Sequence, residues 1–111
     1  CKIYPQIKKN NNIVIYGKGV FANRFIENIR MSNYCNIVEN VDSKDADKLK
    51  YIDANKYDYI VIAIFSAATV LSVLDLLKKM NIDENKILSI EKNSITPDLL
   101  PDEVRKQFLK L

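Results

Sequence analysis

The sequence predicts an α/β domain, built on a small parallel sheet of four strands with flanking helices. Three observations lead to this fold class. Apolar, β-branched runs that are typical of strands alternate with segments of helical period. The only two glycines, Gly17 and Gly19, stand directly after the first such run. The run 57–65 is almost wholly apolar, as in a strand that is covered on both faces by helices.

Length and composition predict one domain over residues 1–111, with a core over 12–90 and a tail over 91–111. Hydrophobic residues make up 48% of the chain and charged residues 28%, which is ordinary for a globular domain. The first residue is Cys1 and no signal-peptide pattern follows it, so we expect a piece of a longer protein. The longest apolar stretch is far too short to span a bilayer, so no membrane segment is expected.

The first half of the core predicts a strand, a helix and a second strand. The strand covers 13–16, and the helix runs from about Gly19 to Met31, because Ala22, Phe25, Ile26 and Ile29 recur on one helical face. Ser32 and Asn33 form its exit. A second strand fits 37–41, and the charged stretch 43–55 is expected to be a loop with one helical turn.

The second half predicts a strand over 57–65, a helix that Ser66 can cap, and a strand over 86–90. Asn81 is a suitable left-handed stop for that helix. In the tail, Pro101 is a suitable first helical residue. An amphipathic C-terminal helix is therefore expected, whose apolar stripe consists of Leu100, Val104, Phe108 and Leu111.

Right-handed crossovers and a doubly buried third strand together predict the strand order 2-1-3-4. In such a sheet, ligands meet the crevice at the carboxyl ends of strands one and three, where the order reverses. The segment that follows strand one is Gly17-Lys18-Gly19-Val20-Phe21-Ala22, a G-x-G-x-x-A motif between a strand and a helix. This is the dinucleotide-binding fingerprint with alanine in the third place.

Each position of the motif has a physical reason. The first glycine turns the chain sharply, the second lets a phosphate lie against the backbone, and the small third residue allows helix and strand to pack closely. The helix N-terminus then presents N–H groups to the phosphates. Gly17, Lys18, Gly19 and Val20 are therefore the predicted phosphate-binding residues, and Lys18 is either a nearby cation or a solvated loop residue.

Further candidates for the site follow the second and third strands. Asp42 ends the second strand about 20 residues after the glycines, where an acid can accept hydrogen bonds from a ribose; the alternative is an ordinary turn aspartate. Glu39 lies within that strand and is the weaker candidate. Ser66 and Thr69 follow the third strand, so their hydroxyls either face a ligand or cap the next helix.

The residues that several other kinds of catalytic or binding site require are absent from the sequence or wrongly spaced. Histidine is absent, which excludes Ser-His-Asp and Cys-His catalysis and His-ligated zinc, and no metal is expected. Tyr51 and Lys56 do not have the spacing of a Tyr-Lys couple. Lysines are scattered among acids at a net charge of +3, so no nucleic-acid partner is expected. Two isolated cysteines fit a cytoplasmic location.

The segment 12–90 resembles the small Rossmann-like domains attached to bacterial sugar acyltransferases, glycosyltransferases and other surface-polysaccharide or nucleotide-sugar enzymes. The resemblance is carried by the strand ending Tyr-Gly-x-Gly, the strand ending in Asp42, the "YDYIVIAI" strand and the "LLKKMNIDENKILSI" return. It implies a nucleotide-binding or NAD(P)-binding fold, with Gly17, Lys18 and Gly19 at the nucleotide and Asp42 at the ribose. Asn81 replaces the glycine that is usual in that group.

Residues and resemblance together predict an accessory module for NAD or a nucleotide sugar, cut from a cytoplasmic enzyme and not catalytic alone. The parent's other domains are its expected partners, and a homo-oligomer is left open. Two alternatives remain: the cofactor domain of a truncated dehydrogenase or epimerase, and a structural or oligomerisation domain with a vestigial loop. A receiver-type signalling domain is rejected, because strands one and three end at Gly17 and at Phe65-Ser66 without an acidic cluster.

Overall fold

The computed structural model describes residues 7–64 and 66–89. Within them four strands and two α-helices alternate as expected, with three short 3₁₀ helices in the connections. The elements are β1 (Asn12–Tyr16), α1 (Val20–Ser32), β2 (Asn36–Val41), η1 (Ala46–Tyr51), η2 (Ala54–Lys56), β3 (Tyr59–Ile62), α2 (Ala67–Lys79), η3 (Glu84–Lys86) and β4 (Ile87–Ser89). The predicted C-terminal helix lies outside the described residues.

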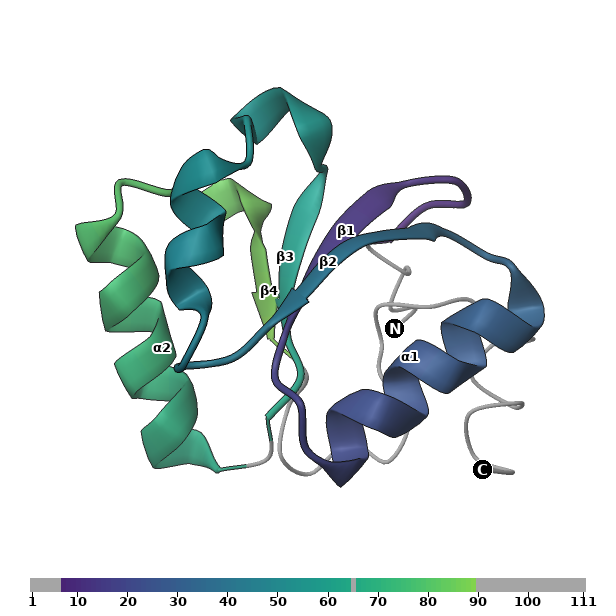
Figure 1. The fold of residues 1–111 in the computed structure, drawn as a ribbon, viewed down its shortest axis with the longest axis horizontal. Coiled ribbons are helices and arrows are strands. Elements are labelled where there is room, and N and C mark those ends of the chain that lie inside the picture. The colour runs from purple at the N-terminus through teal and green to yellow at the C-terminus, as the bar shows by residue number, and fades with distance from the viewer. Residues whose placement is uncertain (1–6, 65, 90–111) are drawn as a thin grey trace, which may run out of the picture.

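The sheet confirms the predicted fold class and order. Its strands are all parallel and lie in the order β2-β1-β3-β4, with β1 paired to both β2 and β3. Figure 1 shows the sheet between α1 on one side and α2 on the other. This arrangement follows from right-handed crossovers, because β1 to β2 and β3 to β4 run across the sheet in opposite directions.

Alternation along β1 divides the core into two layers. Ile13 and Ile15 pack with Phe25 and other residues of α1, whereas Val14 and Tyr16 pack with α2 and η1 on the opposite face. These four side chains of β1 are at most 2% exposed, whereas its first residue, Asn12, is half-buried. A strand with neighbours on both edges and helices on both faces explains why this run lacks a polar alternation.

The third strand is shorter than predicted. The sequence suggested a strand over 57–65, but β3 covers Tyr59–Ile62, whose last three residues are fully buried. Its partner β1 stops at Tyr16, where the chain turns at Gly17, so the parallel ladder has no partner beyond that point. The central, doubly buried position is confirmed, whereas Phe65 lies outside the described residues.

The connection from β2 to β3 contains more helix than the single turn predicted for 43–55. It forms η1 and η2, and η1 places Ala46 and Leu49 in the core layer on the α2 side of the sheet. Asn33 and Asn81 adopt left-handed conformations, with φ of 54° and 61°, after α1 and α2, and the Asn81 prediction is confirmed. No helix among the described residues is long and apolar enough to cross a membrane.

Candidate functional site

A cavity of about 440 Å³ opens where β1 and β3 end. Of the residues that the sequence singled out, Gly17, Lys18, Gly19, Val20, Asp42 and Thr69 border it. The other lining residues are Tyr16, Phe21, Ala22, Ser43, Ala63, Ile64 and Val73. The cavity therefore lies in the predicted crevice, at the point where the strand order reverses.

Gly17 is required by the fold itself. Its φ of +133° is one that residues with a side chain rarely adopt, and an added Cβ would lie 2.8 Å from the carbonyl oxygen of Ala63. The same Cβ would meet Ile64 Cγ1 at 3.3 Å and Ala22 Cβ at 3.5 Å. The Gly17 amide also donates to the carbonyl of Val41 at 2.7 Å. Gly17 thus lies in close contact with three other segments of the chain, and this packing explains the glycine without a ligand.

Gly19 has no comparable structural reason. Its φ is −80° and its ψ −174°, an extended conformation open to any residue, and an added Cβ would meet no atom within 4 Å. It borders the cavity and is the N-cap of α1. Because glycine has no side chain, this cap satisfies none of the N–H groups that a first helical turn leaves without intrahelical acceptors.

The first turn of α1 forms one wall of the cavity. Val20, its first residue, is 73% exposed, whereas Ala22 is fully buried against the Gly17 turn. The small third residue of the motif therefore serves close packing between helix and strand, as expected. The positive end of the helix dipole faces this region of the molecule, which favours an anion there.

Lys18 does not extend freely into the cavity. Its Nζ lies 2.8 Å from Oδ2 of Asp45, a residue in the turn between β2 and η1. This hydrogen bond is the largest cause that raises the pKa of Lys18. The pKa of Asp45 is held well below its usual range, first by the backbone N–H of Asp42 and then by Lys18.

Asp42 lies at the cavity edge within the same turn. Its Oδ1 accepts a hydrogen bond from the amide of Lys44 at 2.9 Å, and its own amide donates to Oδ1 of Asp45 at 2.7 Å. Burial raises the pKa of Tyr16, and the charges of Asp42 and Asp45 raise it further. Tyr16 is 2% exposed and lines the cavity, so its ring forms part of the floor beside these carboxylates.

Asn40 is a supporting residue that sequence reasoning missed. From β2, its Nδ2 donates to the carbonyl of Gly17 at 2.7 Å and to that of Ile15 at 3.1 Å. These bonds tie the glycine turn to the neighbouring strand. A carboxamide two residues before the predicted ribose acid was the available signal, but its partner depends on the register between β1 and β2.

The sequence left two roles open for Ser66 and Thr69, capping a helix or facing a ligand, and the structure places the two residues differently. Ser66 is the N-cap of α2, where its Oγ accepts from the amide of Thr69 at 3.3 Å, and it is not among the residues that line the cavity. Thr69 does line the cavity. The hydroxyl available to a ligand from α2 is thus one turn farther along the helix.

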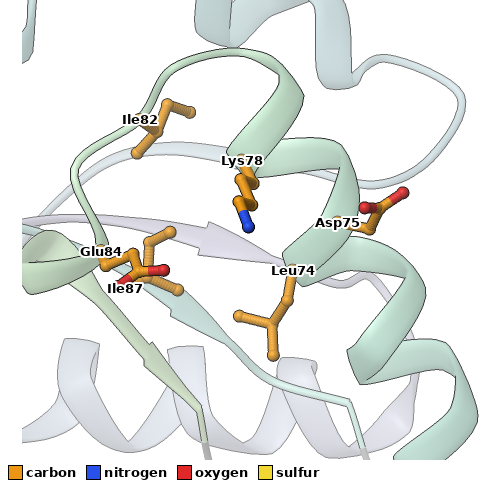
Figure 2. A pocket seen from close by; sticks show the side chains of 6 residues that line it. All are labelled: Leu74, Asp75, Lys78, Ile82, Glu84 and Ile87. Carbon is orange, nitrogen blue, oxygen red and sulfur yellow. The ribbon is translucent and has the colours of Figure 1, made fainter.

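A second cavity, of about 370 Å³, lies between α2 and β4. Figure 2 shows Lys78 extending toward its centre between Leu74 and Glu84, whereas the carboxylate of Asp75 turns away. Ile82 and Ile87 complete its lining. Neither glycine borders it, and the first turns of α1 and α2 are not among its lining residues.

Comparisons of the chain with protein-family models, with curated proteins and with solved structures find no match.

Proposed function

We propose that this chain is a binding module for a nucleotide or nucleotide sugar, acting as an accessory part of a cytoplasmic glycan-biosynthesis enzyme. The observation that carries the proposal is Gly19. A glycine that the fold does not require stands at a helix N-terminus and beside a cavity, and its missing Cβ leaves open space. Close approach of a ligand to the backbone accounts for a glycine at this position.

The remaining lining residues suit the other parts of such a ligand. Asp42 is a carboxylate at the end of β2 and can accept hydrogen bonds from ribose hydroxyls. Ile64 and Val73 offer apolar contact, and Thr69 a hydroxyl, on the α2 side of the cavity. These groups are suited to binding a ligand and orienting it. They include no acid and base pair, so the chemistry is assigned to other domains of the parent enzyme.

The structural alternative has one observation in its favour. Gly17, Asn40 and Lys18 all satisfy partners within the chain, so the turn is held without a ligand. A loop of this kind can persist as a packing device. The cofactor domain of a truncated dehydrogenase or epimerase remains the alternative among enzymes, with NAD as its ligand.

Replacing Gly19 tests the proposal directly. Gly19→Val places a branched side chain where the phosphate is expected, so binding of NAD or UDP-glucose should be lost in calorimetric titration. The extended backbone accepts valine and its Cβ meets open space, so the cost in stability should be modest, that of a poorer N-cap residue, and the urea unfolding midpoint should fall only slightly. Gly19→Ala should show an intermediate loss of affinity.

Equal binding by the wild type and Gly19→Val would place the ligand elsewhere. Failure of the wild type to bind either compound would favour the structural alternative.

A further inference from the structure

Among the described residues that line the site cavity, Lys18 is the one basic residue, and its ammonium group pairs with Asp45. The Nζ–Oδ2 distance is 2.8 Å, and Asp45 itself is not among the lining residues. Lys48, from η1, approaches the same carboxylate at 3.5 Å. The carboxylate of Asp45 is therefore placed to draw the ammonium group away from the cavity toward the β2–η1 turn.

Two kinds of diphosphate ligand differ in what they need from such a site. In a pyrophosphate diester, such as a dinucleotide or a nucleotide sugar, each phosphate carries one negative charge and can be bound by backbone N–H groups at a helix N-terminus. A terminal phosphate carries about −1.5 to −2 at pH 7. Loops that bind nucleoside triphosphates supply a lysine to the terminal phosphates.

Building on the proposed nucleotide site, we infer that Asp45 is a specificity-determining residue, which retains Lys18 and so makes the loop select pyrophosphate diesters over terminal phosphates. A diester loses less by this arrangement, because each of its phosphates carries only one negative charge and the helix terminus offsets part of it. A terminal phosphate has to displace the carboxylate from Lys18 and then lies near an uncompensated Asp45. The same pair also keeps the loop joined to the turn that carries Asp42.

Asp45 can be changed without removing the hydrogen bond that shapes the turn. Its Oδ1 accepts from the amide of Asp42, and an asparagine carbonyl oxygen can accept the same bond. Asp45→Asn therefore removes the charge and keeps the acceptor. Asp47→Asn is the matched control, since Asp47 also belongs to this segment but, among the described residues, its ion pair is with Lys50, at 3.5 Å.

The experiment measures dissociation constants of NAD and UDP-glucose as diesters, and of ADP and UDP as their terminal-phosphate counterparts. Wild type should bind each diester more tightly than its counterpart. Asp45→Asn should tighten ADP and UDP by about fivefold or more, the effect of one unit charge a few ångströms away in water, and should tighten the diesters by a clearly smaller factor, because each of their phosphates carries less charge than a terminal phosphate. Asp47→Asn should change neither class. Adding Lys18→Met to Asp45→Asn should abolish the gain.

Three results would overturn the inference while leaving the site intact: tighter binding of ADP than NAD by the wild type, equal gains for both classes in Asp45→Asn, or no gain for either. If no diester binds to the wild type, the proposed function fails, and the inference fails with it. Circular dichroism of each variant separates these outcomes from loss of the fold.

Discussion

At the scale of single residues, the two glycines have different roles although they stand two positions apart. Gly17 has a positive φ and no room for a Cβ, whereas Gly19 has an ordinary φ and open space around it. The first is explained by the fold, whereas the second is the N-cap of α1, where the fold leaves room for a side chain. A motif read from sequence treats the two alike, so the backbone geometry adds the distinction.

Gly17→Ala should destabilise the protein by about 2–3 kcal/mol, because the alanine is strained at φ +133° and its Cβ lies 2.8 Å from a carbonyl oxygen. Gly19→Ala is the control and should stay within about 0.5 kcal/mol of the wild type. Urea unfolding of the three proteins measures both values. Equal stability of Gly17→Ala and the wild type would contradict the strained turn.

Asp42 bears on the choice between adenine dinucleotides. A carboxylate accepts from both ribose hydroxyls but repels a 2′-phosphate, so wild type should bind NAD about five- to tenfold more tightly than NADP. Asp42→Ala should bring the two dissociation constants together. Asp53→Ala is a matched control, because Asp53 accepts from the amide of Asn55 at 2.9 Å as Asp42 does from Lys44, away from the cavity.

Tighter binding of NADP to the wild type would remove Asp42 from the ribose position. An unchanged ratio in Asp42→Ala would make this aspartate an ordinary turn residue.

Among the elements, the start of helix α2 separates a capping residue, Ser66, from a residue of the cavity wall, Thr69. Ser66 accepts the Thr69 amide and does not line the cavity. Ser66→Ala should therefore cost about 1 kcal/mol of stability and leave nucleotide affinity unchanged. Thr69→Val, at the cavity wall, should weaken binding instead. A loss of affinity in Ser66→Ala larger than in Thr69→Val would restore Ser66 to the ligand site.

At the scale of the whole molecule, Cys35 couples stability to alkaline pH. Burial raises the pKa of its thiol from 9.0 to about 11, and the residue is 7% exposed. Between these values the unfolded chain loses the proton and the folded chain keeps it, so the unfolded state binds fewer protons. The free energy of unfolding contributed by this group is therefore full below pH 9 and falls as the pH rises toward 11.

Cys35→Ala should remove that component, so the difference in unfolding free energy between wild type and variant should shrink from pH 8.5 to pH 11. Chemical denaturation across this range is the measurement. A difference that stays constant with pH would show that the thiol titrates alike in both states.

Much of the architecture was predictable because its signals are local. Strand and helix periods recur within a few residues, so β1, α1, β2 and α2 were located to within about two residues at their ends, and the strand order followed from the burial of one run. The tight turn at Gly17 and the left-handed conformation of Asn81 were likewise predictable from single residues, because glycine and asparagine adopt positive φ more readily than other residues.

Strand lengths and side-chain partners depend on residues that are far apart in the sequence, so only the folded structure shows them. β3 is short because its neighbour β1 turns away after Tyr16, which no property of the run 57–65 reveals. Lys18 meets Asp45 across 27 positions, and Asn40 meets Gly17 across 23, because the parallel pairing places Asn40 opposite Ile15 and so brings the ends of β1 and β2 together. The local pattern of residues was enough to locate the elements and the glycine loop. The packing of strands and helices against one another determined which loop residues have partners within the fold. It also left Gly19 with open space where a side chain would lie.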